Sequence, residues 1–446
     1  MRDRRLDFWR GLCLVDMLLV HLIHEGIQFG ALSALIVDYT RFAAGGFVFV
    51  AGLGVGLVYL ARGLTARAAA PAVWRRALYL LGVHYGLTGL IVALDVHRGL
   101  RPPAGDPLGL VRDIVLLREA PAYVDVLPLY VAMLLATPLL LTLLRRGLWP
   151  IVAVASTALF AWGRHDPTAL SPRASVEFPF LLWQAFFVAG LMGSLVVPRL
   201  DRRRHAWPIA MVGAWIAFGV MTVLAYGPRF DVVAESTLLS FTKVPLTTGE
   251  WLRYFATTLA VVTTSAVAWP RIQQAASVVV ITQLGRRSLA VYGAHVFVQM
   301  LVLAVAVPLW SIGAAQASFA LPAVAALWLC ARACDVWERQ AHPFAELRYV
   351  LRSWGAPPVG IIAAGLLVAL TGPMGGDEAL VDMPAAVVAD LDQSAPDIDL
   401  VDAQEEPIFS PADAPSSDEF FSDEPAVEQR DDDDPMQSAV AAPRFV

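Results

Sequence analysis

Hydrophobic runs of helical length follow one another along most of the chain, separated by short polar or arginine-bearing stretches. Each run is close to the length that an α-helix needs to cross a bilayer. The pattern predicts an all-α polytopic membrane protein, a helix bundle with ten or eleven spans. Ten are expected at residues 11–30, 43–61, 76–96, 123–144, 148–163, 179–197, 207–226, 251–269, 284–307 and 314–333. A weaker, glycine-rich candidate at 357–372 would be the eleventh.

The composition agrees with a membrane protein. Hydrophobic residues make up 57% of the 446 residues and charged residues 16%, whereas soluble domains carry about 25% charged residues. The three cysteines form no disulfide framework and no metal-binding pattern. The chain also has no P-loop, no dinucleotide-binding glycine fingerprint and no HExxH sequence. We therefore expect no metal site, no nucleic-acid partner and no ATP-driven transport.

Charge divides the chain into two parts. Residues 375–446 hold 20 acidic residues against two arginines, which is −18 of a net charge of −6, so the rest of the chain carries +12. Few residues of this segment could form a core. We expect a transmembrane domain at residues 1–373 and a disordered acidic tail at 374–446. The tail lies in the cytoplasm with ten spans and outside with eleven.

Basic residues set the expected orientation. With a cytoplasmic N-terminus and alternating loops, the inner loops collect 21 basic residues and the outer loops 10. The positive-inside rule therefore favours a cytoplasmic N-terminus in a bacterial inner membrane. The first hydrophobic run has no small-residue cleavage site, so we expect a retained span rather than a signal peptide.

The first span carries more ionisable side chains than a lipid-facing helix tolerates cheaply. Arg10 and His21 are eleven residues apart, about 16 Å along a helix and close to three turns, so they share roughly one face. Such a pair can hold an anion at one end while the imidazole acts as a general base deeper in the membrane. The alternative is an interfacial anchor and a hydrogen-bonded core histidine. Asp16 and His24 on the same helix are further candidate substrate-binding residues, and His295 in a later span is a reserve candidate for catalysis.

Several segments, in the right order over residues 2–370, resemble the OpgC proteins and the wider acyltransferase-3 superfamily. The opening Arg4-Arg5-Leu6-Asp7-Phe8-Trp9-Arg10-Gly11 precedes an Arg-x10-His spacing that ends at His21. The other matching segments are Phe47-Val48-Phe49-Val50-Ala51-Gly52, Val126-Leu127-Pro128-Leu129-Tyr130, Pro179-Phe180-Leu181-Leu182-Trp183-Gln184 with the following Gly190, and Leu284-Gly285-Arg286-Arg287-Ser288-Leu289.

The resemblance implies about ten helices around a membrane-embedded site. Family members move an acyl group from cytoplasmic acyl-CoA to an extracytoplasmic sugar hydroxyl, and the namesake adds succinyl groups to periplasmic glucans. His21 would then be the catalytic base and Arg10 would hold the donor. Trp183 and Gln184 would line the cavity, with Tyr130 near its outer side. Succinyl-CoA or acetyl-CoA would be the cosubstrate, with no tightly bound cofactor. The expected partners are membrane lipid and a glycan acceptor, in a monomer or small homo-oligomer.

Two acids of the family pattern are absent. Val20 stands where the family tends to have Asp, and Gly45 where it tends to have Glu. Asp16 lies about 140° round the helix from His21, whereas Glu25 follows His21 by four residues on the same face and could orient the imidazole. Two other functions stay open: a secondary transporter or flippase, or a catalytically inactive scaffold.

Charged residues in the expected outer loops or at span ends lie where a glycan would approach. Most charged loop residues are simply solvated, so each is a weak candidate for substrate contact. They are Arg41, Arg112, Asp125, Glu177, Lys243 and Glu250.

Overall fold

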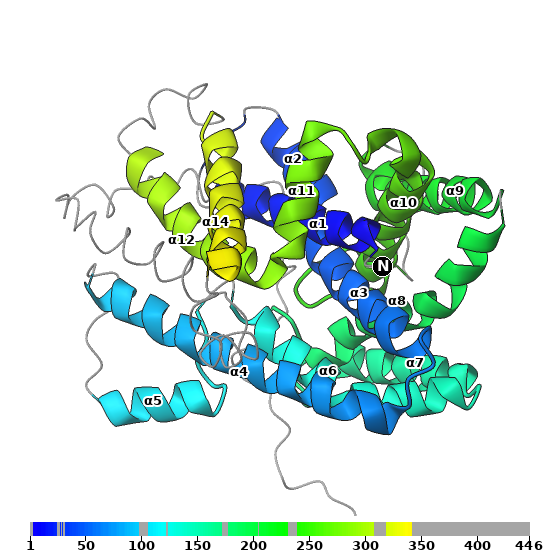
Figure 1. The fold of residues 1–446 in the computed structure, drawn as a ribbon, viewed down its shortest axis with the longest axis horizontal. Helices are drawn as coiled ribbons and strands as arrows, with labels where there is room; N and C mark the ends of the chain where they lie inside the picture. The colour runs from blue at the N-terminus through cyan, green and yellow to red at the C-terminus, as the bar shows by residue number, and fades with distance from the viewer. Residues whose placement is uncertain are drawn as a thin grey trace, which may run out of the picture. The chain divides into compact units, whose positions relative to one another are not determined.

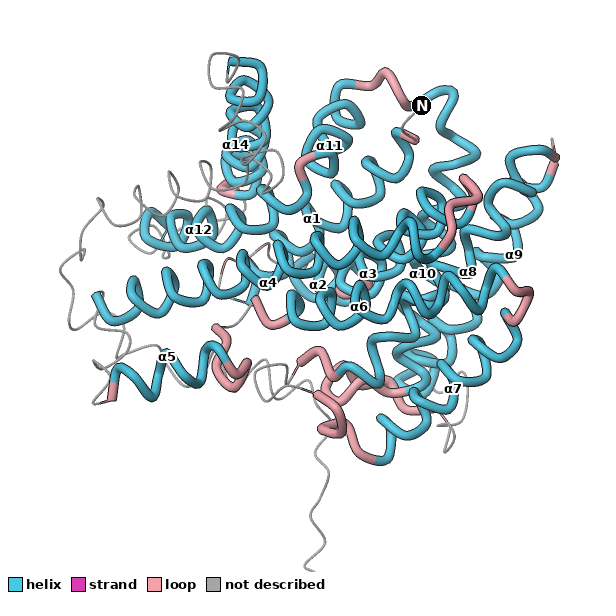
Figure 2. The backbone as a smooth tube through the Cα atoms, turned by 60° about the horizontal axis from the view of Figure 1, so that its bottom comes forward, coloured by secondary structure: helices cyan, strands magenta, loops and turns pink. Residues whose placement is uncertain are grey.

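A computed structural model describes residues 3–24, 27, 29, 32–97, 106–121, 124–171, 177–203, 205–230, 239–306 and 318–340. Helices account for most of these residues, and there is no strand among them (Figure 2). The helices, labelled in Figure 1, are α1 (Arg4–His24), α2 (Leu32–Thr40), α3 (Ala43–Val55), η1 (Gly56–Leu60), α4 (Ala66–His97), α5 (Pro107–Val115), α6 (Val126–Arg145), α7 (Trp149–His165), α8 (Phe180–Arg202), α9 (Ala206–Tyr226), η2 (Gly227–Phe230), α10 (Thr248–Ile272), α11 (Ala276–Arg286), α12 (Ser288–Ala306) and α14 (Ala320–Gln340).

The all-helical membrane fold predicted from the sequence is confirmed. Within the described residues, five helical stretches are long and apolar enough to cross a bilayer. They are Leu32–Leu60, Ala66–His97, Val126–Arg145, Phe180–Arg202 and Ala206–Tyr226. The other predicted spans also fall on helices. The candidate at 357–372 and the predicted domain boundary at 373 lie outside the described residues.

The structure adds two details to the predicted spans. The run 284–307 is not one helix, because α11 ends at Arg286 and α12 begins at Ser288. Arg286 and Arg287 at this break both pair with Asp335 of α14, at 2.5 Å and 2.6 Å between Nη2 and a carboxylate oxygen. Two short helices, α2 and α5, were not predicted as separate elements. Helix α5 is nine residues long, below the length of a span, whereas α2 forms the first part of the stretch Leu32–Leu60.

Glycines allow the closest helix crossings. Where α1 crosses α11, a Cβ on Gly11 would overlap the carbonyl of Ile281, and one on Gly285 would overlap the carbonyl of Asp7. The α3–α8 crossing is built in the same way, with Gly52 and Gly190 each facing a backbone carbonyl of the other helix. Small residues let membrane helices approach until their backbones touch. These crossings hold α1 against α11 and α3 against α8, and α1 also lies beside α3 (Figure 1).

Polar contacts join helix ends that the predicted topology places on the same side. Near the start of α1, Arg5 pairs with Asp201 at the end of α8, with Nη1 and Oδ1 2.9 Å apart. The Arg145 guanidinium at the end of α6 donates to the carbonyl of Leu64, in the turn after η1. All four residues belong to the predicted inner loops or the span ends beside them. We call this end of the bundle the N-terminal end.

A second set of contacts joins predicted outer segments. Lys243 pairs with Glu177 at 3.1 Å between Nζ and Oε2. Arg164 at the end of α7 donates to the carbonyl of Leu246, 3.3 Å away. The described contacts thus agree with the alternation of loops predicted from the sequence.

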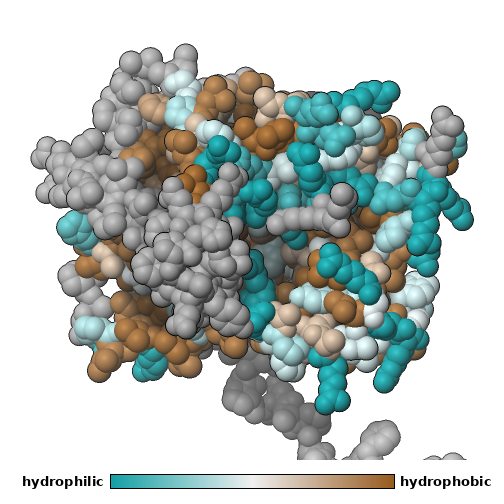
Figure 3. Space-filling model, viewed as in Figure 1, coloured by the Kyte–Doolittle hydropathy of each residue, from teal (hydrophilic) through white to brown (hydrophobic). Residues whose placement is uncertain are grey.

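Large apolar side chains remain exposed on the outside of the bundle, interrupted by clusters of hydrophilic residues (Figure 3). Helix α9 is the strongest case, since only 6% of the residues in its most apolar stretch are buried. Ile209 and Ile216 on this helix are 71% and 62% exposed. Such a surface is stable only where lipid, rather than water, surrounds it.

Candidate functional site

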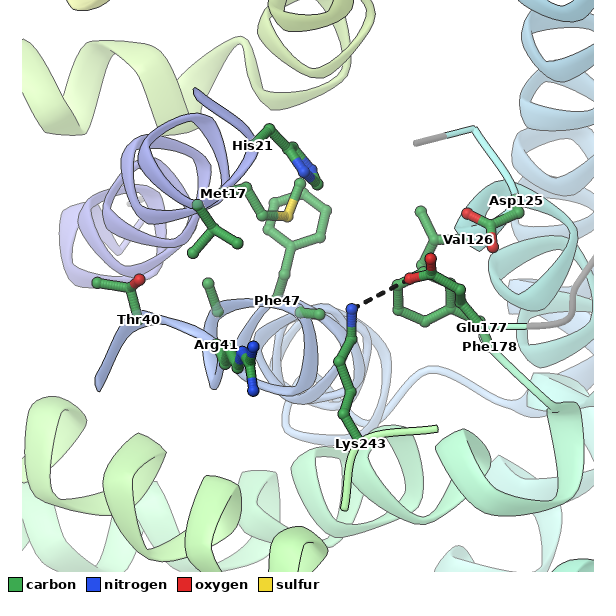
Figure 4. A pocket seen from close by; sticks show the side chains of 13 residues that line it. Met17, His21, Thr40, Arg41, Phe47, Asp125, Val126, Glu177, Phe178 and Lys243 are labelled. Carbon is green, nitrogen blue, oxygen red and sulfur yellow. Dashed lines mark hydrogen bonds and ion pairs between the residues drawn. The ribbon is translucent and has the colours of Figure 1, made fainter. Parts of the chain in front are cut away.

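A pocket that is partly open to the outside lies beside the C-terminal half of α1 (Figure 4). Its walls come from α1, the turn between α2 and α3, the start of α3, the start of α6, the segment before α8 and the segment before α10. The lining residues are Met17, Val20, His21, Thr40, Arg41, Ala43, Ala44, Phe47, Asp125, Val126, Glu177, Phe178 and Lys243.

The pocket brings His21 together with four of the charged residues that the sequence offered only as weak candidates. These are Arg41, Asp125, Glu177 and Lys243. They come from four different segments of the chain and converge only in the folded bundle. Of the other two weak candidates, Glu250 forms a buried ion pair with Arg253 at 2.6 Å. Arg112 pairs with Asp113 on the exposed helix α5. Neither lines the pocket.

A second histidine lies directly against His21. The imidazole rings of His21 and His295 are stacked, with centroids 5.5 Å apart and planes 30° apart. The Nδ1 atom of His295 hydrogen-bonds the carbonyl of Tyr292. Because a carbonyl only accepts, Nδ1 must carry the proton, which leaves a lone pair on Nε2. That Nε2 atom is buried and has no hydrogen-bond partner among the described residues. His295, the reserve candidate for catalysis, therefore lies next to His21, the predicted base.

The four charged residues around His21 differ in their electrical state. Lys243 and Glu177 neutralise each other across the 3.1 Å ion pair drawn in Figure 4. Asp125 precedes the span that begins at Val126 and is only 7% exposed. Burial, with a smaller contribution from the nearby Glu177 carboxylate, raises the pKa of Asp125 to about 7. Asp125 is therefore partly protonated near neutral pH.

Arg10 lies away from this pocket, at the N-terminal end of α1. Its Nη1 atom is 3.7 Å from Oδ1 of Asp7, and its guanidinium covers Gly54 of α3. Asp16 and His24 are also outside the pocket lining, and His24 is exposed. Glu25 lies outside the described residues. The structure thus separates Arg10 from His21 by the length of helix that the sequence spacing implied.

The cavity residues suggested by the family resemblance form the wall behind the pocket. Trp183 is fully buried, and its ring centroid is 4.7 Å from that of Phe178, which lines the pocket. Tyr130 stands edge-on to Phe47, another lining residue, at 5.9 Å. The Tyr130 hydroxyl is buried without a hydrogen-bond partner among the described residues.

Gln184 ties α8 to α7. Its amide nitrogen donates to the carbonyl of Ser156 at 2.8 Å, and its amide oxygen accepts from the Ser156 hydroxyl at 2.8 Å. Gln184 is 3% exposed and does not line the pocket.

The two positions that lack the family acids have different surroundings. Val20 lines the pocket beside His21. Gly45 faces the Phe186 ring, and a Cβ there would lie 2.9 Å from it. Asp125 and Glu177 supply carboxylates to the same pocket from other elements. Asp125 directly precedes the Val126-Leu127-Pro128-Leu129-Tyr130 segment. This position next to a family segment is the sequence feature that could have indicated Asp125 as a site residue.

The pocket offers groups for acid–base and electrostatic chemistry. Within the described residues, no group of three or more His, Cys, Asp or Glu side chains could hold a metal ion.

Comparison with known families identifies the chain's relatives. The sequence model of the family described as OpgC protein matches residues 2–339. The chain belongs to the OpgC family. Membership supports a membrane-bound, glucan-modifying acyltransferase in general terms. No curated protein and no solved structure matches the chain. The OpgC match ends before the acidic tail, and it contains all thirteen residues of the pocket.

Proposed function

We propose that this OpgC protein is an inner-membrane O-acyltransferase that moves an acyl group from cytoplasmic acyl-CoA to a hydroxyl of an extracytoplasmic glycan. The observation that carries the proposal is the position of His21, which lines a pocket at the end of the bundle opposite the chain's start. Succinyl is the leading candidate for the acyl group, because the family's namesake transfers it. The N-terminus is cytoplasmic in this proposal, and the glycan reaches the pocket from outside.

His21 acts as the general base. A half-buried imidazole can take a proton from a sugar hydroxyl at neutral pH. The ring of His295 packs against it and limits its orientations. The hydroxyl oxygen bonds to the thioester carbonyl carbon as its proton passes to His21. The carbon–sulfur bond then breaks, and CoA leaves with a proton returned from the imidazole.

Lys243 is a candidate to donate a hydrogen bond to the oxyanion of this step. It lines the pocket and interacts electrostatically with His21. Its ammonium group is held in place by Glu177. An ammonium group held in place can donate a hydrogen bond to an oxygen that becomes negative during the reaction.

Arg10 binds the anionic part of the donor at the N-terminal end of the bundle. Asp7 lies 3.7 Å from it and the α3 backbone packs against it, so the guanidinium is held there. About 16 Å of α1 then separates the donor's charged end from the reacting end. Membrane lipid surrounds the bundle, as a monomer or small oligomer.

The test is release of CoA from succinyl-CoA and acetyl-CoA by the full chain in detergent, with a neutral glucan oligosaccharide as acceptor. We expect His21→Ala to lower the rate by about 100-fold or more, the usual loss when a general base is removed. His165→Ala is the matched control, because His165 is exposed and lies outside the pocket.

Equal rates for His21→Ala and wild type would remove His21 as the base. If folded wild-type protein neither turns over nor binds either donor, the acyltransferase proposal fails, and transport or scaffolding becomes the better account.

A further inference from the structure

Arg41 is the one pocket-lining cation that no carboxylate neutralises among the described residues. It occupies the turn between α2 and α3, where its backbone N–H donates to the carbonyl of Val37 at 3.1 Å. Its side-chain Nε atom is buried and has no hydrogen-bond partner within the described part of the chain. A buried guanidinium N–H without an acceptor is costly. A ligand oxyanion in the pocket would remove that cost.

The start of α3 adds to the same positive potential. Ala43 and Ala44, in the first turn of this 13-residue helix, both line the pocket. The preceding residue, Phe42, gives the helix no side-chain cap. The free N–H groups of a helix start and its dipole favour an anion. Arg41 and this helix start therefore favour the same kind of ligand.

The acids of the pocket compete only weakly for Arg41. Glu177 is engaged by Lys243 on the other side of the pocket. The pKa of Asp125 is raised to about 7 by its burial, so its negative charge is incomplete near neutral pH. The positive charge of Arg41 is left for a ligand.

Apolar side chains lie between Arg41 and His21. Figure 4 places Met17 and Phe47 between the guanidinium and the imidazole. This arrangement suits a short aliphatic chain that has its reacting carbonyl at His21 and a negative group at its far end.

We infer that Arg41 and the first turn of α3 form an oxyanion subsite that binds the terminal carboxylate of a dicarboxylic acyl group. This inference rests on the proposed function, and it makes Arg41 the residue that selects a charged over a neutral donor. The same chemistry would also fit an anionic substituent on the acceptor, and the experiment separates the two.

The experiment compares CoA release from succinyl-CoA and acetyl-CoA with a neutral glucan oligosaccharide as acceptor. We expect Arg41→Gln to lower the succinyl rate by roughly tenfold or more, since it removes a charge-assisted contact, and to leave the acetyl rate within about twofold. Arg41→Lys should keep part of the preference, because it keeps the charge but loses the planar fork. Arg112→Gln is the matched control, because Arg112 is exposed and paired with Asp113.

If both donors lose rate equally in Arg41→Gln, or neither does, the inference is wrong. It is also wrong if the variant is impaired only with an acceptor that carries anionic substituents. If the wild type uses neither donor, the proposed function fails. The anion subsite at Arg41 is then tested by the binding of succinate alone. The inference would be upheld if succinate, but not its neutral diamide, raises the melting temperature of wild type and Arg112→Gln. Arg41→Gln should then gain no such protection. Equal protection of all three proteins would overturn it.

Discussion

At the scale of single residues, the pocket contains charged groups that neutralise each other and groups whose charge or lone pair is available to a ligand. Lys243 and Glu177 neutralise each other, His295 has a fixed tautomer, and Arg41 retains its charge for a ligand. The loss of the family acids at Val20 and Gly45 does not leave the site without carboxylates, because Asp125 and Glu177 enter it from other segments. Among the carboxyl groups of the pocket, Asp125 has a pKa raised to about 7.

The raised pKa of Asp125 predicts a pH-dependent effect on stability. The folded protein holds this proton more tightly than the unfolded chain, so the free energy of unfolding falls as pH rises from the ordinary pKa of 3.8 to about 7. Asp125→Asn removes the titrating carboxyl, so the variant does not lose this stability as pH rises. Its melting temperature in detergent, relative to wild type, should therefore increase between pH 4 and pH 7 and stay constant above.

Asp166→Asn provides the contrast. The pKa of Asp166 is lowered, chiefly by the hydrogen bond from the Thr168 hydroxyl. Asp166 therefore stabilises the fold above pH 4, and this contribution is lost as pH falls. The relative melting temperature of Asp166→Asn should change with pH in the opposite direction. A pH-independent difference for Asp125→Asn would show that its carboxyl titrates normally.

Single residues also mark how far sequence reasoning reaches. The spacing of Arg10 and His21 predicted their separation along one helix, and the structure keeps it. The sequence could not assign Arg41 or Lys243, because each is an isolated charge in a loop and acquires its surroundings only when distant segments meet. Gln184 was predicted to line the cavity, but its amide makes its hydrogen bonds to Ser156 and Leu181.

At the scale of elements, hydropathy located the helices because lipid-exposed helices must be apolar along their whole length. It failed where polar chemistry decides the outcome. The run at 284–307 reads as continuous, but α11 ends at Arg286 and α12 begins at Ser288, and at this break Arg286 and Arg287 pair with Asp335. Helix α5 begins at Pro107. The side chain of the preceding Asp106 accepts a hydrogen bond from the N–H of Gly109. That start signal lies in the sequence, but it says nothing about membrane spans.

The glycine contacts between α1 and α11 predict a large effect from a single methyl group. Gly285→Ala would push its Cβ into the carbonyl of Asp7, and backbone cannot move aside as a flexible side chain can. Overpacking of this kind costs about 1–3 kcal/mol. We expect a lower melting temperature and a lower rate of CoA release, because α1 carries His21.

Gly82→Ala is the matched control for this variant. Gly82 is also inside a helix, but a Cβ there would meet nothing within 4 Å. Alanine favours a helix more than glycine does, so stability should stay equal or rise. Similar destabilisation in both variants would mean that the α1–α11 crossing is not as close as the structure has it.

At the scale of the whole molecule, the pocket and Arg10 stand at opposite ends of α1. Contacts near the start of α1 join the predicted inner segments, and contacts near the pocket join the predicted outer ones. The order of the predicted spans gave this alternation, and the arginine counts then gave the orientation, since charge bias is a property of whole loops. Sequence reasoning could not predict the pocket, because the pocket forms only when six separate parts of the chain come together.

Transfer across the membrane requires that the pocket faces outward, and this can be tested with one pair of cysteines. Thr168 and His205 are both exposed and lie in the loops on either side of α8, so a single span separates them. We expect Thr168→Cys to react with a membrane-impermeant maleimide on intact spheroplasts, and His205→Cys to react only after the membrane is permeabilised. The unmodified chain is the background control, since Cys13 and Cys334 are buried and Cys330 is half-buried. The reverse pattern would place the pocket in the cytoplasm. An acyl group taken from cytoplasmic CoA would then never cross the bilayer, and the acceptor would have to be an intracellular hydroxyl.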